Sequence, residues 1–421
     1  MTRFVPGVAP LAHRNYALYW TGQLVSMSGT WIELTATTWL LYQLTDSPLL
    51  LGLGGVFRAA PIFAFALLGG TIADRVERRR LLLFTQSSSV VTSLVLGTLV
   101  FTGQIAFWHI YVISLINATI AAFDAPGRQA LFPTLIPHGQ LQNAITLNSM
   151  LFQTANLVGP AVAGVLIARV GPAWPFFVNA VSYFAIIGGL LLMRVPRLTG
   201  VVRGSIRGEL VGGLRYLRAS TILPLVLAME ASLSLFGHNQ ALITIFARDV
   251  LRSNAEGLGL LLSSIAFGAI AGMITLIVVG DVRRKGLFML GSGAIYALTL
   301  FLFAWSRSFP LSMAILAVLG FADATWGTMR SAIAQLAAED AYRGRVMSFI
   351  LIVARGLTNA SQLETGVATA LVGAPGAATV GALLIGGVIT GVAIRGRRLR
   401  DFAATAPRPV VPQIADAGGD S

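Results

Sequence analysis

The stretch GGTIADRVERRRLLL (residues 69–83) holds six charged side chains in the seven positions 74–80, between two long apolar segments. These segments, near 49–73 and 81–102, are each long enough to cross a bilayer as a helix, which takes about 20 residues. Similar segments recur along all 421 residues, of which 55% are hydrophobic and 11% charged. A soluble domain carries about 25% charged residues. The sequence therefore predicts a membrane protein with many spans and a short charged loop between two of them.

Twelve helical spans are predicted, six on each side of one long polar connection. Residues 195–221 form that connection and are rich in arginine, while the segment from 395 is polar and contains proline. We therefore predict an N-terminal six-helix bundle (1–194), a basic cytoplasmic linker (195–221), a C-terminal six-helix bundle (222–394) and a disordered tail (395–421). The predicted spans lie near 16–43, 49–73, 81–102, 105–126, 143–169, 174–194, 222–247, 256–280, 286–305, 309–331, 346–371 and 375–394.

Positive charge gathers in the loops on one side of these spans. If the N-terminus is cytoplasmic, the outer loops contain only Arg169, Arg248, Arg252 and Arg307. Because cytoplasmic loops carry an excess of Lys and Arg, we expect both termini in the cytoplasm. The same clustering accounts for the net charge of +13 without a nucleic-acid partner. The chain has no cysteine, which excludes disulfides and cysteine-based metal sites.

The two halves of the sequence resemble each other. The tripeptide LGL at 51–53 recurs at 258–260, and Asp74 recurs as Asp281 at the same spacing. Further along, RQAL at 128–131 matches RSAI at 330–333. The same order of matches in both halves predicts a six-helix repeat. Transporters built from such repeats bind substrate at the interface between the halves.

Residues 70–79, Gly-Thr-Ile-Ala-Asp-Arg-Val-Glu-Arg-Arg, resemble the signature between the second and third helices of the major facilitator superfamily, roughly G-x-x-x-D-R-x-G-R-R/K. Glu77 stands where that signature usually has glycine. Three further stretches are similar to the drug and siderophore exporter branch, which includes macrolide efflux proteins and the enterobactin exporter: GQLVSMSGTWIE (22–33), GGLRYLR (212–218) and RGRVMS (343–348). The helix 5 antiporter pattern is partial, with Gly159, Pro160 and Gly164 present but alanine at 155 and 163. The resemblance implies an all-α membrane protein of twelve transmembrane helices in two pseudo-symmetric six-helix bundles, located in the inner membrane of a bacterium.

The resemblance also implies a gating role for the charged loop. Asp74 would hold the cytoplasmic side closed while the cavity faces outward, by binding the start of the eleventh span, where unpaired N–H groups and the helix dipole stabilise a carboxylate. By pseudo-symmetry, Asp281 is expected near the start of the fifth span. Alternatively, these charges only fix the topology or bind anionic lipid headgroups. The expected gating residues are Gly70, Asp74, Arg75, Arg78, Arg79, Asp281, Arg343, Arg345, Gly159 and Pro160.

A polar stripe runs along the first span and contains Glu33. Its spacings of 3, 4, 3 and 4 residues keep the side chains on one helix face, which must avoid lipid and face a cavity or another helix. We expect Glu33 to couple transport to protons, with a carboxylate held by structural hydrogen bonds as the alternative. The other members of the stripe, expected to line the substrate cavity, are Gln23, Ser26, Thr30 and Thr37.

The seventh span carries a second stripe, in which Glu230 is the other candidate for proton coupling. No second ligand stands at metal-site spacing from His238, so a metal site is not expected there. Asp124 is expected to pair with Arg128 at i+4 and to act as a gate. The remaining expected cavity residues are Ser234, His238, Asn239, Asp323 and Trp326.

Arg58 in the second span and Glu364 in the eleventh lie at similar predicted depth from the outer surface. The resemblance implies that these spans are neighbours, so we expect an Arg58–Glu364 bridge that closes the outer side. For Arg355, deeper in the eleventh span, a polar cluster, a contact to an anionic substrate and an intrahelical network all remain open.

Together, these features predict a secondary-active exporter of amphipathic small molecules such as drugs, macrolides or siderophores, driven by proton exchange. An uptake symporter or a flipper of lipid-like substrates is the alternative. The sequence has no Walker loop, no G-x-S-x-G motif and no His-rich metal motif, so neither an enzyme nor a cofactor is expected. The expected partners are membrane lipids, protons and a small-molecule substrate, and we expect a monomer.

Overall fold

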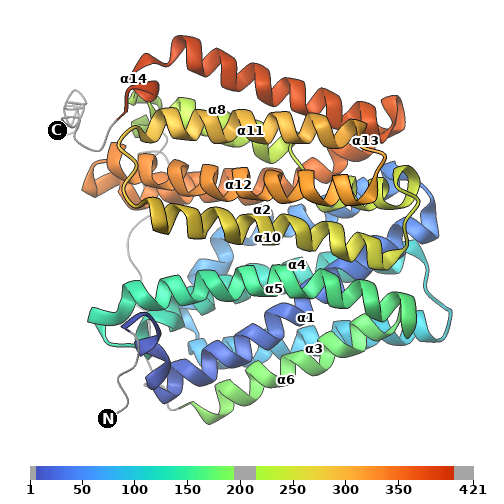
Figure 1. Ribbon diagram of the computed structural model, residues 1–421. Coiled ribbons are helices and arrows are strands. Elements are labelled where there is room, and N and C mark those ends of the chain that lie inside the picture. The colour runs from blue at the N-terminus through green and yellow to red at the C-terminus, as the bar shows by residue number, and fades with distance from the viewer. Residues whose placement is uncertain (1–5, 194–214, 403–421) are drawn as a thin grey trace, which may run out of the picture.

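The computed structural model describes residues 6–193 and 215–402, and within these ranges it contains helices and no strand (Figure 1). Eight of the helices are long and apolar enough to cross a membrane, by length and composition. One of the eight contains both the eleventh and the twelfth predicted span. The all-α membrane class is therefore confirmed, whereas the count of twelve spans stays a prediction.

The first half contains six long helices that follow a short 3-10 helix at Pro6–Ala12. Helix α1 packs against α5 and α6, α3 packs against α4 and α6, and α2 packs against α4. Two of the connecting turns require a positive φ, which glycine supplies at Gly103 (+70°) and Gly171 (+122°). The helices are α1 (Arg14–Thr45), α2 (Pro48–Arg75), α3 (Arg78–Phe101), α4 (Phe107–Leu131), α5 (Leu141–Arg169) and α6 (Trp174–Leu192).

The second half packs around α12, which contacts both α10 and α11, while α13 contacts α8 and α11. Helix α13 is interrupted at Gly373 (φ 74°, ψ 164°), which separates the two spans predicted at 346–371 and 375–394. The helices are α8 (Leu223–Phe236), α9 (Gln240–Ile245) with a π-helical turn at Phe246–Val250, α10 (Ala255–Val279), α11 (Lys285–Trp305), α12 (Phe309–Ala337), α13 (Asp340–Arg395) and α14 (Arg397–Arg400).

The seventh predicted span is broken in its middle, so the prediction of one continuous helix over 222–247 was wrong. Helix α8 ends at Phe236, and α9 begins after Asn239, whose side-chain oxygen accepts a hydrogen bond from Leu242 N at 3.0 Å. The hydroxyl of Tyr296 accepts one from His238 N at 2.9 Å. Non-helical backbone at membrane depth is tolerated where such partners exist or where it lines a cavity.

The polar segments that flank the second half lie partly within the described residues. Residues 195–214 of the predicted linker (195–221) lie outside the described residues, so the domain boundaries stay predictions. The tail was expected to be disordered from residue 395, which is wrong as far as Phe402. Leu399 and Phe402 are buried, and the carbonyl of Phe402 accepts a hydrogen bond from Gly286 N of α11 at 3.4 Å. Burial of these two apolar side chains holds the short helix α14 against the bundle.

The start of α1 and the helix α14 lie at the same end of the molecule, which we call the termini side (Figure 1). At the opposite end, the far side, the two halves touch through backbone at glycines. A Cβ on Gly259 of α10 would lie 2.4 Å from the carbonyl oxygen of Pro160 in α5, and one on Gly52 of α2 would lie 2.5 Å from that of Gln362 in α13. The halves therefore meet closely on the far side along the pairs α5–α10 and α2–α13.

Candidate functional site: a cavity between the two halves

A cavity of about 1010 Å³ lies between the two halves. Every long helix of the first half contributes to its wall, together with the α8–α9 break, α10 and α13 of the second half. The wall extends to Phe132, Pro133 and Leu141 on the termini side. Of the residues singled out in the sequence, the wall includes Gln23, Thr30, Glu33, Thr37, Arg58, Asp124, Arg128, Pro160, His238 and Asn239. It does not include Ser26, Glu230, Ser234, Asp323 or Trp326.

Glu33 is buried in this wall, 7% exposed, and three other helices hold its carboxylate. Ser93 Oγ of α3 and Asn179 Nδ2 of α6 donate to Oε2 at 2.5 and 2.6 Å. Asn117 Nδ2 of α4 donates to Oε1 at 3.3 Å. All three partners are neutral. Glu33 is therefore solvated by neutral donors and can gain or lose a proton without breaking an ion pair.

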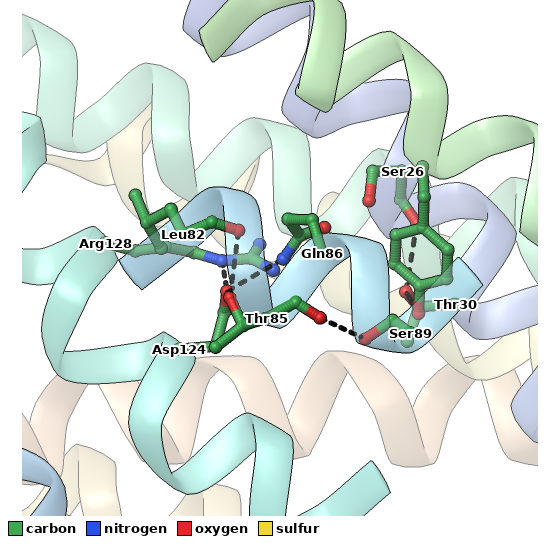
Figure 2. Close-up of polar contacts among 9 residues, drawn as sticks. Ser26, Thr30, Leu82, Thr85, Gln86, Ser89, Asp124 and Arg128 are labelled. Carbon is green, nitrogen blue, oxygen red and sulfur yellow. Dashed lines mark hydrogen bonds and ion pairs between the residues drawn. The ribbon is translucent and has the colours of Figure 1, made fainter. Parts of the chain in front are cut away.

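Asp124, near the C-terminal end of α4, is the centre of a second polar cluster in the same half, and Figure 2 shows its partners. Thr85 Oγ1 and Gln86 Nε2 both donate to Asp124 Oδ1 at 2.8 Å, and Arg128 Nε pairs with Oδ2. The predicted i, i+4 pair is thus confirmed. Its gating role stays a prediction.

Glu230 has surroundings unlike those of Glu33, because it forms a buried ion pair with Arg330 of α12 at 2.5 Å. Trp326 Nε1 and Ser234 Oγ also donate to its carboxylate, at 3.2 and 3.3 Å. Removing the charge of a buried carboxylate that pairs with arginine would leave the cation unpaired. Glu230 therefore suits a fixed structural anion better than a proton carrier.

His238 and Asn239 fill the break between α8 and α9. The hydroxyl of Tyr296 lies 2.8 Å from His238 Nδ1, and Asp323 interacts electrostatically with the same histidine. Asn239 Nδ2 donates to Thr365 Oγ1 of α13 at 2.6 Å. The polar side chains at the break thus connect the cavity wall with α11 and α13.

Arginines of the charged loop after α2 form hydrogen bonds to the ends of two other helices of the first half. Arg78 Nη1 donates to the carbonyl of Ala130 near the end of α4 at 2.9 Å, and Arg79 Nη2 donates to that of Leu191 near the end of α6 at 2.8 Å. Cations at helix C-termini complement the helix dipole. Glu77, which stands off the family signature, forms an ion pair with Arg80 at 2.9 Å.

The proposed latches belong to the state in which the termini side is closed, and the cavity here reaches that side. Gly70 and the side chains of Asp74, Arg75 and Arg355 are outside the part of the structure that is described. Asp281 pairs with Lys285 in its own turn. Near the start of α13, Arg343 Nε donates to Gln335 O at 3.1 Å, and the Arg345 guanidinium lies 5.3 Å from the centroid of the Tyr342 ring.

The far side is closed by a clamp of four residues, Tyr42 and Asp46 of the first half with Arg248 and Asp249 of the second. The Tyr42 hydroxyl donates to Asp249 Oδ2. Arg248 Nη1 donates to Tyr42 O at 2.9 Å, and its Nη2 lies 2.8 Å from Asp46 Oδ1. A peripheral ion pair, Arg169–Glu256 at 3.1 Å, joins α5 to α10.

The expected Arg58–Glu364 bridge is absent from the described residues, although the far side is closed. Thr365 Oγ1 lies 3.5 Å from Glu364 Oε2, whereas Arg58 lines the cavity. That prediction is wrong for this conformation, because similar depth along two helices does not place two side chains on facing sides. In α5, a Cβ on Gly159 would lie 2.4 Å from the Cβ of Trp31, so this glycine packs on α1, while Pro160 contacts α10.

Sequence reasoning missed most partners of the buried charges. Asn117 and Asn179 are single amides within apolar spans, a signal that the sequence carries. Arg330 was identified only as part of the repeat, and the clamp residues Tyr42, Arg248 and Asp249 were not identified as gating residues at all. Their roles depend on which helices pack together.

Comparison with known proteins finds likeness along nearly the whole chain. A family model described as "Transmembrane secretion effector" matches residues 5–414. The enterobactin exporter EntS of Shigella boydii is 24% identical over 306 residues, 73% of each chain. The staphyloferrin A transporter of Staphylococcus aureus is 26% identical over 167 residues, 39% of this chain and 42% of that one.

Solved structures share the fold at low sequence identity. A POT family transporter in complex with a thioalcohol-conjugated peptide has a TM-score of 0.72 at 11% identity, over 92% of this chain and 96% of that one. A bacterial homologue of the iron transporter ferroportin, in an inward-facing state, has a TM-score of 0.64 at 15% identity, over 90% and 98%.

Proposed function

We propose that this transporter exports small molecules from the cytoplasm in exchange for protons. The proposal starts from the family: the chain belongs to the transmembrane secretion effector family of the major facilitator superfamily. The chain is a multi-pass membrane transporter related to siderophore exporters, and its family consists of transporters and not enzymes. Export direction, proton coupling and the substrate class are the proposal. With both termini cytoplasmic, as the positive-inside rule predicts, the cavity faces inward and is ready to load substrate.

The observation that carries the proposal is Glu33 in the cavity wall. Its carboxylate is buried, faces the cavity between the halves and has three neutral hydrogen-bond donors. An ionisable group at membrane depth is costly, and such groups mark ion and proton pathways. Glu33 binds a proton when the cavity faces outward and releases it to the cytoplasm when the cavity faces inward.

The exchange of substrate for protons takes place by alternating access of the cavity to the two sides of the membrane. In the described conformation the far side is sealed by the Tyr42–Asp249 clamp and by the glycine contacts of α10 and α2. Rocking of one half against the other opens that side and closes the termini side, which moves the wall and its bound substrate between compartments. The Asp124–Arg128 pair lies in the wall and is expected to respond to this movement.

The test is transport by the wild-type protein in inside-out proteoliposomes with an acidic lumen. The panel contains fluorescent dyes, macrolides and siderophores, and the control is the same preparation with the gradient collapsed by a protonophore. The proposal expects at least one compound to accumulate in the acidic lumen only while the gradient stands. Accumulation on the side toward which protons flow down their gradient would instead identify an uptake symporter. Gradient-independent movement would identify a flipper.

A further inference from the structure

Arg58 is a cavity residue without a counter-charge. It lies on α2 in the cavity wall, and no ion pair with it exists among the described residues. The other charged side chains of that wall have polar partners within the protein: Arg128 pairs with Asp124, and the carboxylate of Glu33 accepts three hydrogen bonds from neutral donors. Arg58 is therefore the wall charge whose partner has to come from elsewhere.

An unpaired cation at membrane depth is costly, and a bound anion would offset that cost. The planar guanidinium matches a carboxylate in a bidentate arrangement, which makes arginine selective for planar oxyanions. A cation placed here for structure alone would be expected to have a protein carboxylate beside it. Glu364, on the adjacent α13, does not take that position.

Amides in the same wall give a second, independent indication of a ligand. Gln23 is 3% exposed, and neither its Oε1 nor its Nε2 has a hydrogen-bond partner. The Oε1 atoms of Gln86 and of Gln362, which is 6% exposed, are also without partners. Buried polar atoms are nearly always hydrogen-bonded, so unpaired amides around a cavity indicate ligand groups that donate and accept hydrogen bonds there.

Gln362 lies on a helix that packs directly against the helix of Arg58. A Cβ on Gly55 would lie 2.5 Å from the carbonyl oxygen of Asn359 and 2.6 Å from the Cβ of Gln362, so the backbones of α2 and α13 are in close contact one turn away from Arg58. The cation and the unpaired amide of Gln362 thus lie on two adjacent helices at the far end of the cavity.

We infer that Arg58 is the anion-binding residue of the cavity, and that the substrate is an organic acid whose carboxylate pairs with Arg58 while Gln23 and Gln362 bind its uncharged oxygen and nitrogen atoms. This inference rests on the proposed function only in treating the cavity as the substrate site. It names the substrate class, and it makes Arg58 a binding residue where the sequence had indicated a gate.

The experiment measures dye binding to purified protein in detergent by fluorescence polarisation, without a membrane or a gradient. The probes are carboxyfluorescein and rhodamine 123, which share a xanthene ring system but carry negative and positive charge. The variants are Arg58→Gln and Arg58→Lys, with Arg307→Gln as the matched control because Arg307 is exposed in the turn between α11 and α12. Because no transport is measured, failure of proton coupling does not affect the outcome.

Wild-type protein is expected to bind the anionic dye more tightly than the cationic one. Arg58→Gln should weaken carboxyfluorescein binding about tenfold or more, which is the loss expected for a hydrogen bond to a charged group. Arg58→Lys should retain part of that affinity, and Arg307→Gln all of it. The melting temperature of Arg58→Gln should not fall, because the change removes an unpaired charge.

Three results would overturn the inference. The first is wild-type protein that binds the anion no more tightly than the cation. The second is unchanged carboxyfluorescein affinity in Arg58→Gln. The third is equal loss of both dyes together with a lower melting temperature, which identifies a structural arginine.

Discussion

The clamp on the far side makes a quantitative prediction for the substitution Tyr42→Phe. Tyr42 is 2% exposed, and its hydroxyl donates to the carboxylate of Asp249 across the two halves. A hydrogen bond to a charged group contributes about 1.5–3 kcal/mol, and because Asp249 is exposed, water replaces part of that contribution. We therefore expect about 1.5 kcal/mol, which raises the outward-open population about tenfold.

Asp46→Asn is the matched control in the same clamp. It removes the charge of the Arg248–Asp46 pair, but the Asp46 side chain is 76% exposed. An exposed pair contributes about 0–1 kcal/mol, and the neutral amide keeps an oxygen that accepts from Arg248. We expect less than about a threefold change in the outward-open population.

Because the chain has no cysteine, the substitution Thr37→Cys introduces a single thiol into the cavity wall for the assay. Intact cells are treated with a membrane-impermeant maleimide, which reaches this thiol from outside only while the far side is open. The labelling rate is proportional to the outward-open population and should rise about tenfold on Tyr42→Phe. A rate unchanged by Tyr42→Phe, or a larger effect of Asp46→Asn, would refute the clamp as the element that holds the far side closed.

Two further tests, each with a control or compensating substitution, concern the packing and the polar network. Gly259→Val should also raise the maleimide labelling rate, because its Cβ would lie 2.4 Å from a backbone oxygen of α5. Gly291→Val should leave the rate unchanged, since a Cβ there meets nothing within 4 Å. Equal labelling rates in both variants would contradict the predicted role of the α5–α10 contact. Asp124→Ala should destabilise the protein by about 3 kcal/mol in thermal denaturation, because it leaves Arg128 in the wall without its carboxylate. Adding Arg128→Met should restore most of this loss, and a double variant no more stable than the single one would show that the pair is not the cause.

The sequence predicted those features that depend on one helix at a time. The apolar runs located the helices, the spacing along the first span placed Glu33 in the cavity wall, and i, i+4 spacing paired Asp124 with Arg128. It failed where two helices must be oriented relative to each other. Similar depth suggested a bridge for Arg58, but depth does not fix which side of a helix a residue occupies.

The break between α8 and α9 was missed for a different reason. A long apolar run predicts a continuous helix, and the interruption depends on tertiary partners of His238 and Asn239 supplied by Tyr296 and Thr365. Those partners lie 58 and 126 residues away along the chain, so no local pattern reveals them.

The most direct test of proton coupling compares wild type with Glu33→Gln in the same proteoliposomes, using a substrate that the wild-type panel identifies. Two quantities are measured, accumulation driven by an imposed pH gradient and exchange of labelled for unlabelled substrate without a gradient. Because glutamine preserves the shape of the site but cannot carry a proton, we expect Glu33→Gln to lose driven accumulation and to keep exchange. Driven accumulation that survives unchanged in Glu33→Gln would contradict the assignment of proton coupling to Glu33.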